Sequence, residues 1–261
     1  MFWEEAGSGR DAVLFVHGFP LTSALWDDQL AEAASGWRYL APDLPGFGRT
    51  PALPGTPLTV DLLAGTLVSF LDELALAQAV VCGLSMGGYI AFELWRRHPD
   101  RVRALVLAST RALPDTPETR RGRYERAARA RAEGALAVAE PMVAQLLSEA
   151  TRRDRPEIVA RLRGIMNQVA VDGLAGALEG TAVRPDSTPT LGTITVPTLV
   201  LAGEADTISP AAEMRALADA IPGSSFRVLP GAGHLAPMEA PDAFNAELRA
   251  FLRERVSGGR G

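Results

Sequence analysis

The chain has 261 residues, and its 31 acidic residues outnumber its 26 basic ones, which are all arginine, for a formal net charge of -5. An acidic balance argues against a nucleic-acid partner, and the lack of lysine excludes Schiff-base enzymes, lysine-linked pyridoxal enzymes and P-loop nucleotidases. The single cysteine, Cys82, excludes an intrachain disulfide and a cysteine-rich zinc site.

The start of the chain does not resemble an export signal. Residues 1–10 are acidic and polar without an apolar segment, and no run of about 18 apolar residues, the length that spans a membrane, occurs elsewhere. We therefore expect a cytoplasmic protein without a membrane partner.

Short apolar runs alternate along the chain with segments of helical spacing. The predicted strands are residues 12–16, 37–41, 79–82, 102–108, 196–201 and 226–229. The predicted helices are residues 24–34, 59–76, 86–97, 210–220 and 240–256. This alternation predicts a doubly wound α/β fold, with a mainly parallel sheet covered by helices on both faces.

One long segment departs from the alternation. Residues 113–191 are rich in Ala, Arg and Glu at helical spacing, are broken by prolines, and contain no convincing strand. We predict an inserted unit of about four helices there. The core then comprises residues 1–112 and 192–261, with a disordered tail at 257–261.

The strongest chemical signal is Gly-x-Ser-x-Gly at residues 83–87, between a predicted strand and a predicted helix. In that context the motif is typical of a nucleophile elbow, a tight turn that exposes the hydroxyl of Ser85. Glycines are required two residues either side because the turn leaves no room for side chains. The helix N-terminus would favour an oxyanion close by.

A serine nucleophile needs a base, and the chain has three histidines. His234 lies in a glycine-rich loop after the last predicted strand, where it could reach Ser85. His98 is interpreted as a cation at a helix C-terminus, and His17 follows the first predicted strand.

The acid that orients the base is expected after a strand between Ser85 and His234. Two carboxylates follow the strand at 196–201, and we favour Asp206, in the loop beyond the Gly203 turn, with Glu204 as the alternative. Capping of the next helix is the competing interpretation of Asp206.

The backbone N–H groups of Met86 and Phe19 are the predicted oxyanion donors. Phe19, Trp26 and Met86 are predicted to line the substrate pocket, although core packing would explain each of them nearly as well.

Five motifs in order show that the chain resembles the α/β-hydrolase fold superfamily. They are residues 17–20 (HGFP), 43–49 (DLPGFGR), 83–88 (GLSMGG), 203–206 (GEAD) and 233–234 (GH). The resemblance implies that Asp43 and Arg49 stabilise a loop, that His17 is structural beside the oxyanion loop, and that 113–191 is a helical cap.

In detail the motifs are similar to those of small carboxylesterases, 3-oxoadipate enol-lactonases and cofactor-free haloperoxidase-like hydrolases. Epoxide hydrolases and haloalkane dehalogenases of this fold have an aspartate where this chain has Ser85, so their chemistry is disfavoured. Cofactor-free dioxygenases, which lack the serine, are disfavoured for the same reason.

We therefore expect a serine hydrolase that cleaves a small carboxylic ester or lactone through an acyl-enzyme intermediate, without cofactor or metal. A carbon–carbon bond hydrolase on the same triad and a ligand-binding receptor on a hydrolase scaffold remain as alternatives. Cap arginines such as Arg120, Arg121, Arg152 and Arg153 are interpreted as solvated helix faces, with contact to an acidic substrate as the alternative.

Overall fold

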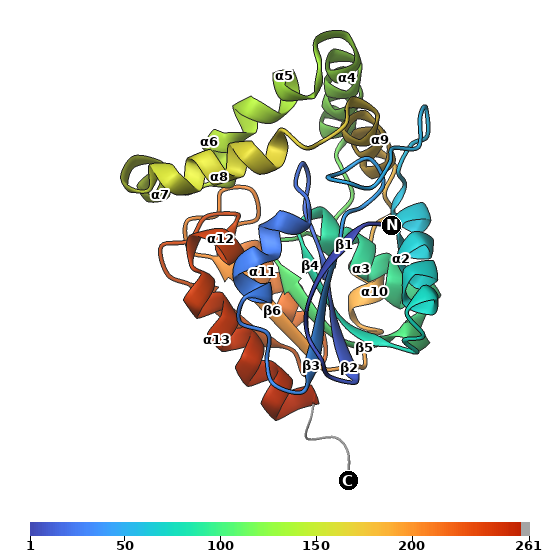
Figure 1. Ribbon diagram of the computed structural model, residues 1–261, viewed down its shortest axis with the longest axis vertical. Helices are drawn as coiled ribbons and strands as arrows, with labels where there is room; N and C mark the ends of the chain where they lie inside the picture. The colour runs from blue at the N-terminus through green and yellow to red at the C-terminus, as the bar shows by residue number, and fades with distance from the viewer. Residues whose placement is uncertain (257–261) are drawn as a thin grey trace.

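A seven-stranded sheet runs through the computed structural model, which describes residues 1–256 (Figure 1). The strand order is β1-β3-β2-β4-β5-β6-β7, and β1 alone pairs antiparallel with its neighbour. The strands are β1 (Trp3–Gly7), β2 (Asp11–Val16), β3 (Trp37–Pro42), β4 (Ala79–Leu84), β5 (Val102–Ala108), β6 (Thr198–Gly203) and β7 (Ser225–Leu229). The predicted doubly wound, mainly parallel α/β sheet is confirmed; the predicted disordered tail lies outside the described residues.

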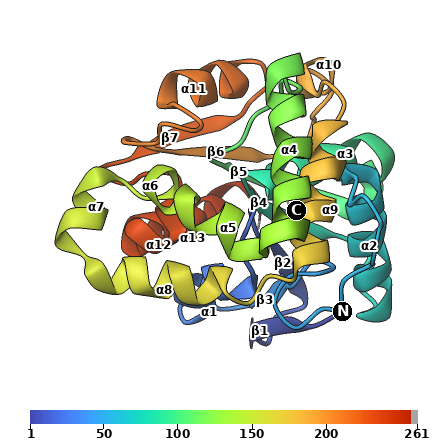
Figure 2. The same ribbon diagram turned by 90° about the horizontal axis from the view of Figure 1, so that it is seen from above.

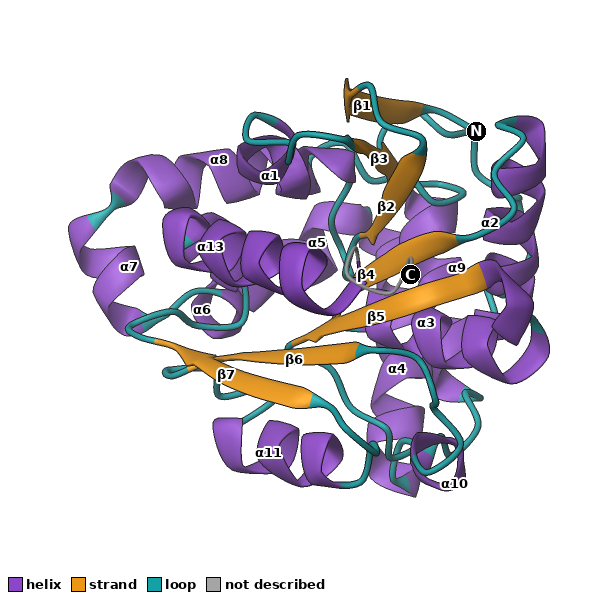
Figure 3. Ribbon diagram, turned by 90° about the horizontal axis from the view of Figure 1, so that it is seen from below, coloured by secondary structure: helices purple, strands orange, loops and turns teal. Residues whose placement is uncertain are grey.

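Helices cover both faces of the sheet (Figure 3). One face carries α2 (Val60–Glu73), α3 (Met86–Arg97) and α11 (Ala211–Asp219), and the other carries α1 (Asp27–Leu30) and α13 (Pro241–Phe251). The expected helix at 24–34 is a short 3₁₀ turn, Ser23–Trp26, followed by α1, and the expected helix at 240–256 is α13 followed by a π turn, Leu252–Val256. No helix of residues 1–256 is both long and apolar enough to span a membrane.

The parallel pairing gathers the carboxyl ends of the strands at one edge. Val16 of β2 is level with Gly83 of β4, and Leu84 of β4 is level with Ala108 of β5. Gly203 of β6 is level with Leu229 of β7. The loops that carry the predicted catalytic residues therefore begin side by side, as expected for an active site on a parallel sheet.

Helices between β5 and β6 lie over this edge (Figures 1 and 2). They are α4 (Pro117–Glu133), α5 (Ala135–Ala139), α6 (Val143–Leu146), α7 (Glu149–Asp154), α8 (Pro156–Met166) and α9 (Val171–Ala182). A further short helix, α10 (Thr188–Leu191), is held instead to α3, because Arg96 donates to Ser187 and Thr190. The chain thus returns to the core side before residue 191.

A buried ion-pair cluster fixes the cap to the core. Asp115, in the loop before α4, pairs with Arg123 of α4 and with Arg184, which follows α9. The Arg184 guanidinium also lies over the Tyr89 ring, 4.4 Å from its centroid, and so reaches α3. Burial acts to raise the pKa of Asp115, but the two arginines outweigh it and hold the pKa below its usual value.

We expect the Asp115→Asn variant to lose about 3 kcal/mol of unfolding free energy, because it leaves two largely buried guanidinium groups without their anion. Urea denaturation at pH 7 measures this, with Asp154→Asn, which removes an exposed ion pair to Arg153, as the matched control that leaves the midpoint unchanged.

The stabilisation by Asp115 should depend on pH. A lowered pKa makes this contribution present above the ordinary value of 3.8 and lost as pH falls through the lowered pKa. The difference in stability between the wild type and Asp115→Asn should therefore begin to shrink below about pH 4 and vanish only below the lowered pKa of Asp115. An equal difference at pH 7 and in strong acid would contradict this role.

Candidate active site

Ser85 lies on the turn between β4 and α3 with φ 53° and ψ -110°, a backbone conformation that side-chain-bearing residues rarely adopt. A Cβ at Gly83 would lie 2.4 Å from the carbonyl oxygen of Gly87, and one at Gly87 would lie 2.1 Å from that of Val16. Both flanking glycines are therefore required by close backbone contacts. Thr110 secures the turn by donating its hydroxyl to the Ser85 carbonyl at 2.7 Å.

His234 and Asp206 form a buried pair. His234 Nδ1 lies 2.9 Å from Asp206 Oδ2, and the other carboxylate oxygen accepts the backbone N–H groups of Ile208 and Ser209 at 2.8 and 2.9 Å. Burial acts to raise the pKa of Asp206, but His234 and these amides outweigh it and keep the pKa below its usual value. The ionised carboxylate favours a proton on Nδ1 and leaves Nε2 free to accept one.

Ser85 and His234 line one cavity of about 140 Å³ beneath the cap. Its apolar wall includes Phe19, Met86, Leu146 and Leu178. Ser85 is half-buried, whereas His234 is almost fully buried. The structure thus brings the predicted nucleophile and base to the same enclosed space, with the predicted acid behind the base.

The alternative acid, Glu204, points elsewhere. This exposed side chain accepts the backbone N–H of Gly231 at 2.9 Å. Asp206 is therefore the carboxylate that orients His234 in the structure, as the loop position after Gly203 predicts.

His17 is structural in this geometry. The ring is buried, with Nδ1 donating to the Gly18 carbonyl at 2.9 Å and Nε2 accepting the Leu44 N–H at 3.1 Å. Burial lowers the pKa of His17, despite opposing contributions from the Gly18 carbonyl and Asp43. Both ring nitrogens are used to hold the loops that flank the site.

The remaining motif residues also act on loops. Asp43 accepts the backbone N–H groups of Ser23 and Arg49 at 2.7 and 2.8 Å, so it ties together the loops after β2 and β3. His98 caps the C-terminal end of α3, the end opposite Ser85.

The predicted oxyanion donors flank the nucleophile. Met86 is the first residue of α3, so its backbone N–H has no carbonyl one helical turn earlier to bind. The loop that carries Phe19 also lies against Ser85, because a Cβ built on Gly18 would be 3.3 Å from the Ser85 Cβ. Both Phe19 and Met86 line the cavity.

The prediction that Trp26 lines the pocket is wrong. Trp26 is fully buried, with its ring centroid 5.0 Å from that of Phe15 and 6.0 Å from that of Phe244, and it does not border the cavity. It fills the space between the sheet and α13, so the core-packing interpretation holds for this residue.

Glu239 is a site residue that the sequence reasoning missed. In the short helix α12 (Ala236–Glu239), its buried carboxylate accepts the Gly233 N–H at 3.0 Å and the Ser148 N–H at 2.8 Å. It thereby joins the loop of His234 to the cap segment between α6 and α7. A carboxylate five residues after His234 carries no sequence signal of its own.

Two cap arginines were also missed. Arg123 and Arg126 of α4 line the cavity, whereas Arg120, Arg121, Arg152 and Arg153 are exposed and do not. The helical spacing offers only a weak signal: Arg123 lies four positions before Ala127 and Arg126 lies four positions before Ala130, so the arginines share a face with the two buried residues of α4.

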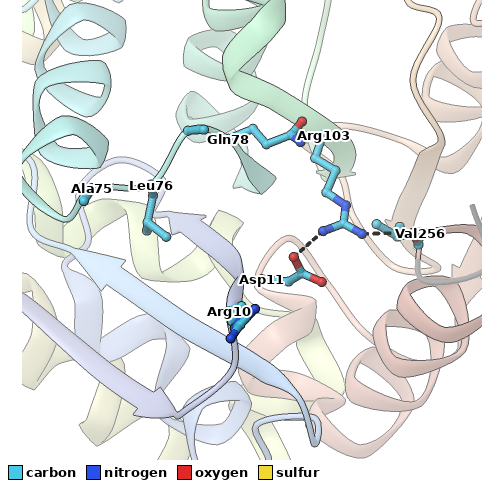
Figure 4. A pocket seen from close by; sticks show the side chains of 8 residues that line it. Arg10, Asp11, Ala75, Leu76, Gln78, Arg103 and Val256 are labelled. Atoms are coloured by element: carbon cyan, nitrogen blue, oxygen red, sulfur yellow. Dashed lines mark hydrogen bonds and ion pairs between the residues drawn. The ribbon is translucent and has the colours of Figure 1, made fainter. Parts of the chain in front are cut away.

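A larger hollow, of about 480 Å³, lies at the opposite edge of the sheet (Figure 4). Figure 4 shows Arg103 directed at Asp11, 2.5 Å away, and at the carbonyl of Val256. Asp11 begins β2, so this hollow is separated from Ser85 by the length of the strands. Although this hollow is larger than the cavity beside Ser85, it is too far from Ser85 to be the candidate active site.

Comparison with known proteins agrees with this geometry. A family model described as the alpha/beta hydrolase fold matches residues 11–241. The solved structure of a thermophilic esterase from Thermogutta terrifontis with malate bound is 42% identical to this chain, with a TM-score of 0.95. The match covers 98% of this chain and 94% of the esterase chain.

Two lactonases are also similar. 3-Oxoadipate enol-lactonase 2 of Acinetobacter baylyi is 29% identical over 244 residues, which are 94% of this chain and 89% of that protein. The enol-lactonase structure from Burkholderia xenovorans is 28% identical, with a TM-score of 0.87 and coverage of 97% and 96%. The resemblance inferred from the five motifs is confirmed: the chain belongs to the α/β-hydrolase fold family.

Proposed function

We propose that this protein is a serine hydrolase that cleaves small carboxylic esters or lactones. The observation that carries the proposal is the hydrogen-bonded pair of His234 and Asp206, whose imidazole lines the same cavity as the strained Ser85. A nucleophile on a tight turn, a base and an acid that fixes the tautomer of the base are the parts that acyl transfer needs.

In the proposed first step, Ser85 Oγ attacks the ester carbonyl while His234 Nε2 takes the hydroxyl proton. The carbonyl oxygen becomes an oxyanion held by the backbone N–H groups of Phe19 and Met86. The tetrahedral intermediate then expels the alcohol, which receives the proton from His234, and leaves the acyl group on Ser85.

Deacylation repeats the sequence with water. His234 takes a proton from water, the hydroxide attacks the acyl carbonyl, and Ser85 leaves with the returned proton as the acid product is released. Asp206 stabilises the imidazolium that forms in both halves. With a lactone, the alcohol and the acid remain one molecule, and no other step changes.

The cavity volume and the relatives support a small substrate. A volume of about 140 Å³ is below the usual range for drug-sized ligands and suits a short acyl chain. The esterase and the enol-lactonases among the similar proteins have names that fit this chemistry.

The proposal includes a cytoplasmic location. The single cysteine, Cys82, is buried and free, which suits that location.

A series of p-nitrophenyl esters from acetate to decanoate tests the proposal. We expect turnover of the acetate and butyrate esters, with kcat/KM falling for the longer chains that exceed the cavity. An alkyl phosphonate should modify the protein once, and peptide mass spectrometry should find the adduct on Ser85.

Two results would contradict this function. Acylation of Ser85 without turnover would favour a binding protein on a hydrolase scaffold. A folded protein that neither turns over the esters and simple lactones nor reacts with the phosphonate would exclude a serine hydrolase.

A further inference from the structure

Positively charged side chains predominate around the cavity that contains Ser85 and His234. Among the residues that line it, the basic side chains are Arg123, Arg126 and His234, and none is an aspartate or glutamate. A cavity walled by cations and apolar groups favours an anionic guest, because the low-dielectric surroundings strengthen the attraction.

Arg123 already has a carboxylate partner. Its guanidinium pairs with Asp115, which also pairs with Arg184. One carboxylate therefore serves two arginines, and it forms no ion pair with Arg126.

Arg126 has no carboxylate partner within residues 1–256. Its Nε donates to the Gly122 carbonyl at 3.1 Å, one turn earlier in α4. Two other arginines of the same helix do have carboxylate partners: Arg129 pairs with Glu133, and Arg131 pairs with Glu179. The residue is exposed at the rim of the cavity, so an arriving substrate can reach it.

The surroundings of Arg126 leave its charge poorly compensated. Burial of its guanidinium and the neighbouring charge of Arg123 lower the pKa of Arg126, by more than Asp115 raises it. An arginine nevertheless stays protonated at neutral pH. Such a group gains more from an incoming anion than a well-solvated or paired arginine does.

We propose that Arg126 binds a carboxylate on the substrate, so that the preferred substrates are carboxylate-bearing esters or lactones. This inference rests on the proposed function and deepens it. One uncompensated guanidinium matches a singly charged carboxylate, to which it can donate two parallel N–H bonds. A carboxylate on the acyl side would give a dicarboxylate, one on the alcohol side would give a hydroxy acid, and a carboxylate-bearing lactone would give a hydroxy dicarboxylate.

Paired substrates test the inference directly. Monomethyl glutarate carries a free carboxylate on its acyl side, and methyl 4-carbamoylbutanoate is its neutral isostere; 4-acetoxybutanoate and 4-acetoxybutanamide place the same pair on the alcohol side. We expect kcat/KM to favour the anion in at least one pair by about 10- to 100-fold, the range expected for a hydrogen-bonded charged partner.

Variants identify the residue that is responsible. Arg126→Gln should bring the anion-to-amide ratio close to one, and Arg126→Glu should reverse the preference. Arg120→Gln is the matched control, because Arg120 lies on the same helix, has no ion-pair partner among the described residues and does not line this cavity. That variant should keep the wild-type ratio.

Equilibrium binding separates this inference from the proposed function. Titration calorimetry should show glutarate binding to Ser85→Ala protein, and about 10-fold or greater weakening when Arg126→Gln is added. Hydrolysis of neutral and anionic esters at equal rates would overturn the carboxylate site while leaving the esterase function intact. If no ester is cleaved, the proposed function fails, but the carboxylate site can still be tested by binding. Loss of glutarate binding in the Arg126→Gln variant would support the site, and unchanged binding would overturn it.

Discussion

The Ser85→Ala variant is expected to lose about 10⁵- to 10⁶-fold in kcat/KM for p-nitrophenyl acetate, the scale seen when the nucleophile of a serine triad is removed. The proposed oxyanion donors and the cavity remain, but no hydroxyl is left to form the proposed acyl-enzyme. Initial-rate assays measure the loss, and the preparation must exclude wild-type enzyme to below one part in about 10⁶ for a loss of this size to be visible.

The fold should survive this change. Alanine lacks only the hydroxyl, and the positive φ of residue 85 strains alanine as it strains serine. Circular dichroism and the thermal midpoint should therefore match the wild type closely.

Ser109→Ala is the matched control for Ser85→Ala. Ser109 follows β5 as Ser85 follows β4 and has a positive φ of 46°. It is buried, and its hydroxyl has no hydrogen-bond partner among residues 1–256. Losing that hydroxyl leaves no acceptor unsatisfied, so activity should stay within a few-fold of wild type. Residual activity above about 1% in Ser85→Ala, far above the loss expected of a nucleophile, would contradict the assigned role.

The catalytic candidates could be predicted because each carries a local signal. Ser85 has flanking glycines between a strand and a helix, His234 follows the last strand in a glycine-rich loop, and Asp206 lies beyond the Gly203 turn. In a parallel sheet such positions converge whatever the details of packing. Knowledge of the strand ends was therefore enough to group these residues.

Features that depend on tertiary packing could not be predicted in this way. The sequence alone fits Trp26 equally well to a pocket wall or to the core, and only its ring contacts with Phe15 and Phe244 place it in the core.

The edge strand β1 was also missed, because its sequence, WEEAG, is polar. It is stabilised by antiparallel pairing with β3 at the edge of the sheet.

The cap shows the same limit. Its helices are shorter and more numerous than the periodicity suggests, because close packing on the core replaces the long apolar faces that a sequence reveals. In α4 only Ala127 and Ala130 are buried, so the inward face that carries Arg123 and Arg126 has almost no hydrophobic signature.

The Asp206→Asn variant is expected to lose about 10⁴-fold in kcat, the effect known for the equivalent change in a serine protease triad. The asparagine amide can donate to His234 Nδ1 where the carboxylate accepted from it. The imidazole proton then moves to Nε2, and the ring can no longer take the proton of Ser85. Initial rates with p-nitrophenyl acetate across the pH range measure the effect.

The pH profile of the wild type follows from the same pair. Because the pKa of Asp206 is lowered, its carboxylate is ionised throughout the range above its ordinary value of 3.8. The acid limb of kcat/KM above about pH 4 should therefore contain no titration of Asp206.

Comparison of Glu204→Gln with Asp206→Asn tests which of the two carboxylates is the orienting acid. Glu204 binds the Gly231 backbone and not His234, so its amide variant should retain activity within a few-fold. Asparagine at 206 can still accept the N–H groups of Ile208 and Ser209, which keeps the loop in place and restricts the effect to the proton on the imidazole. If Glu204→Gln instead lost the larger share of kcat, Glu204 would be the orienting acid in the working enzyme and the His234–Asp206 hydrogen bond would not be the catalytic one.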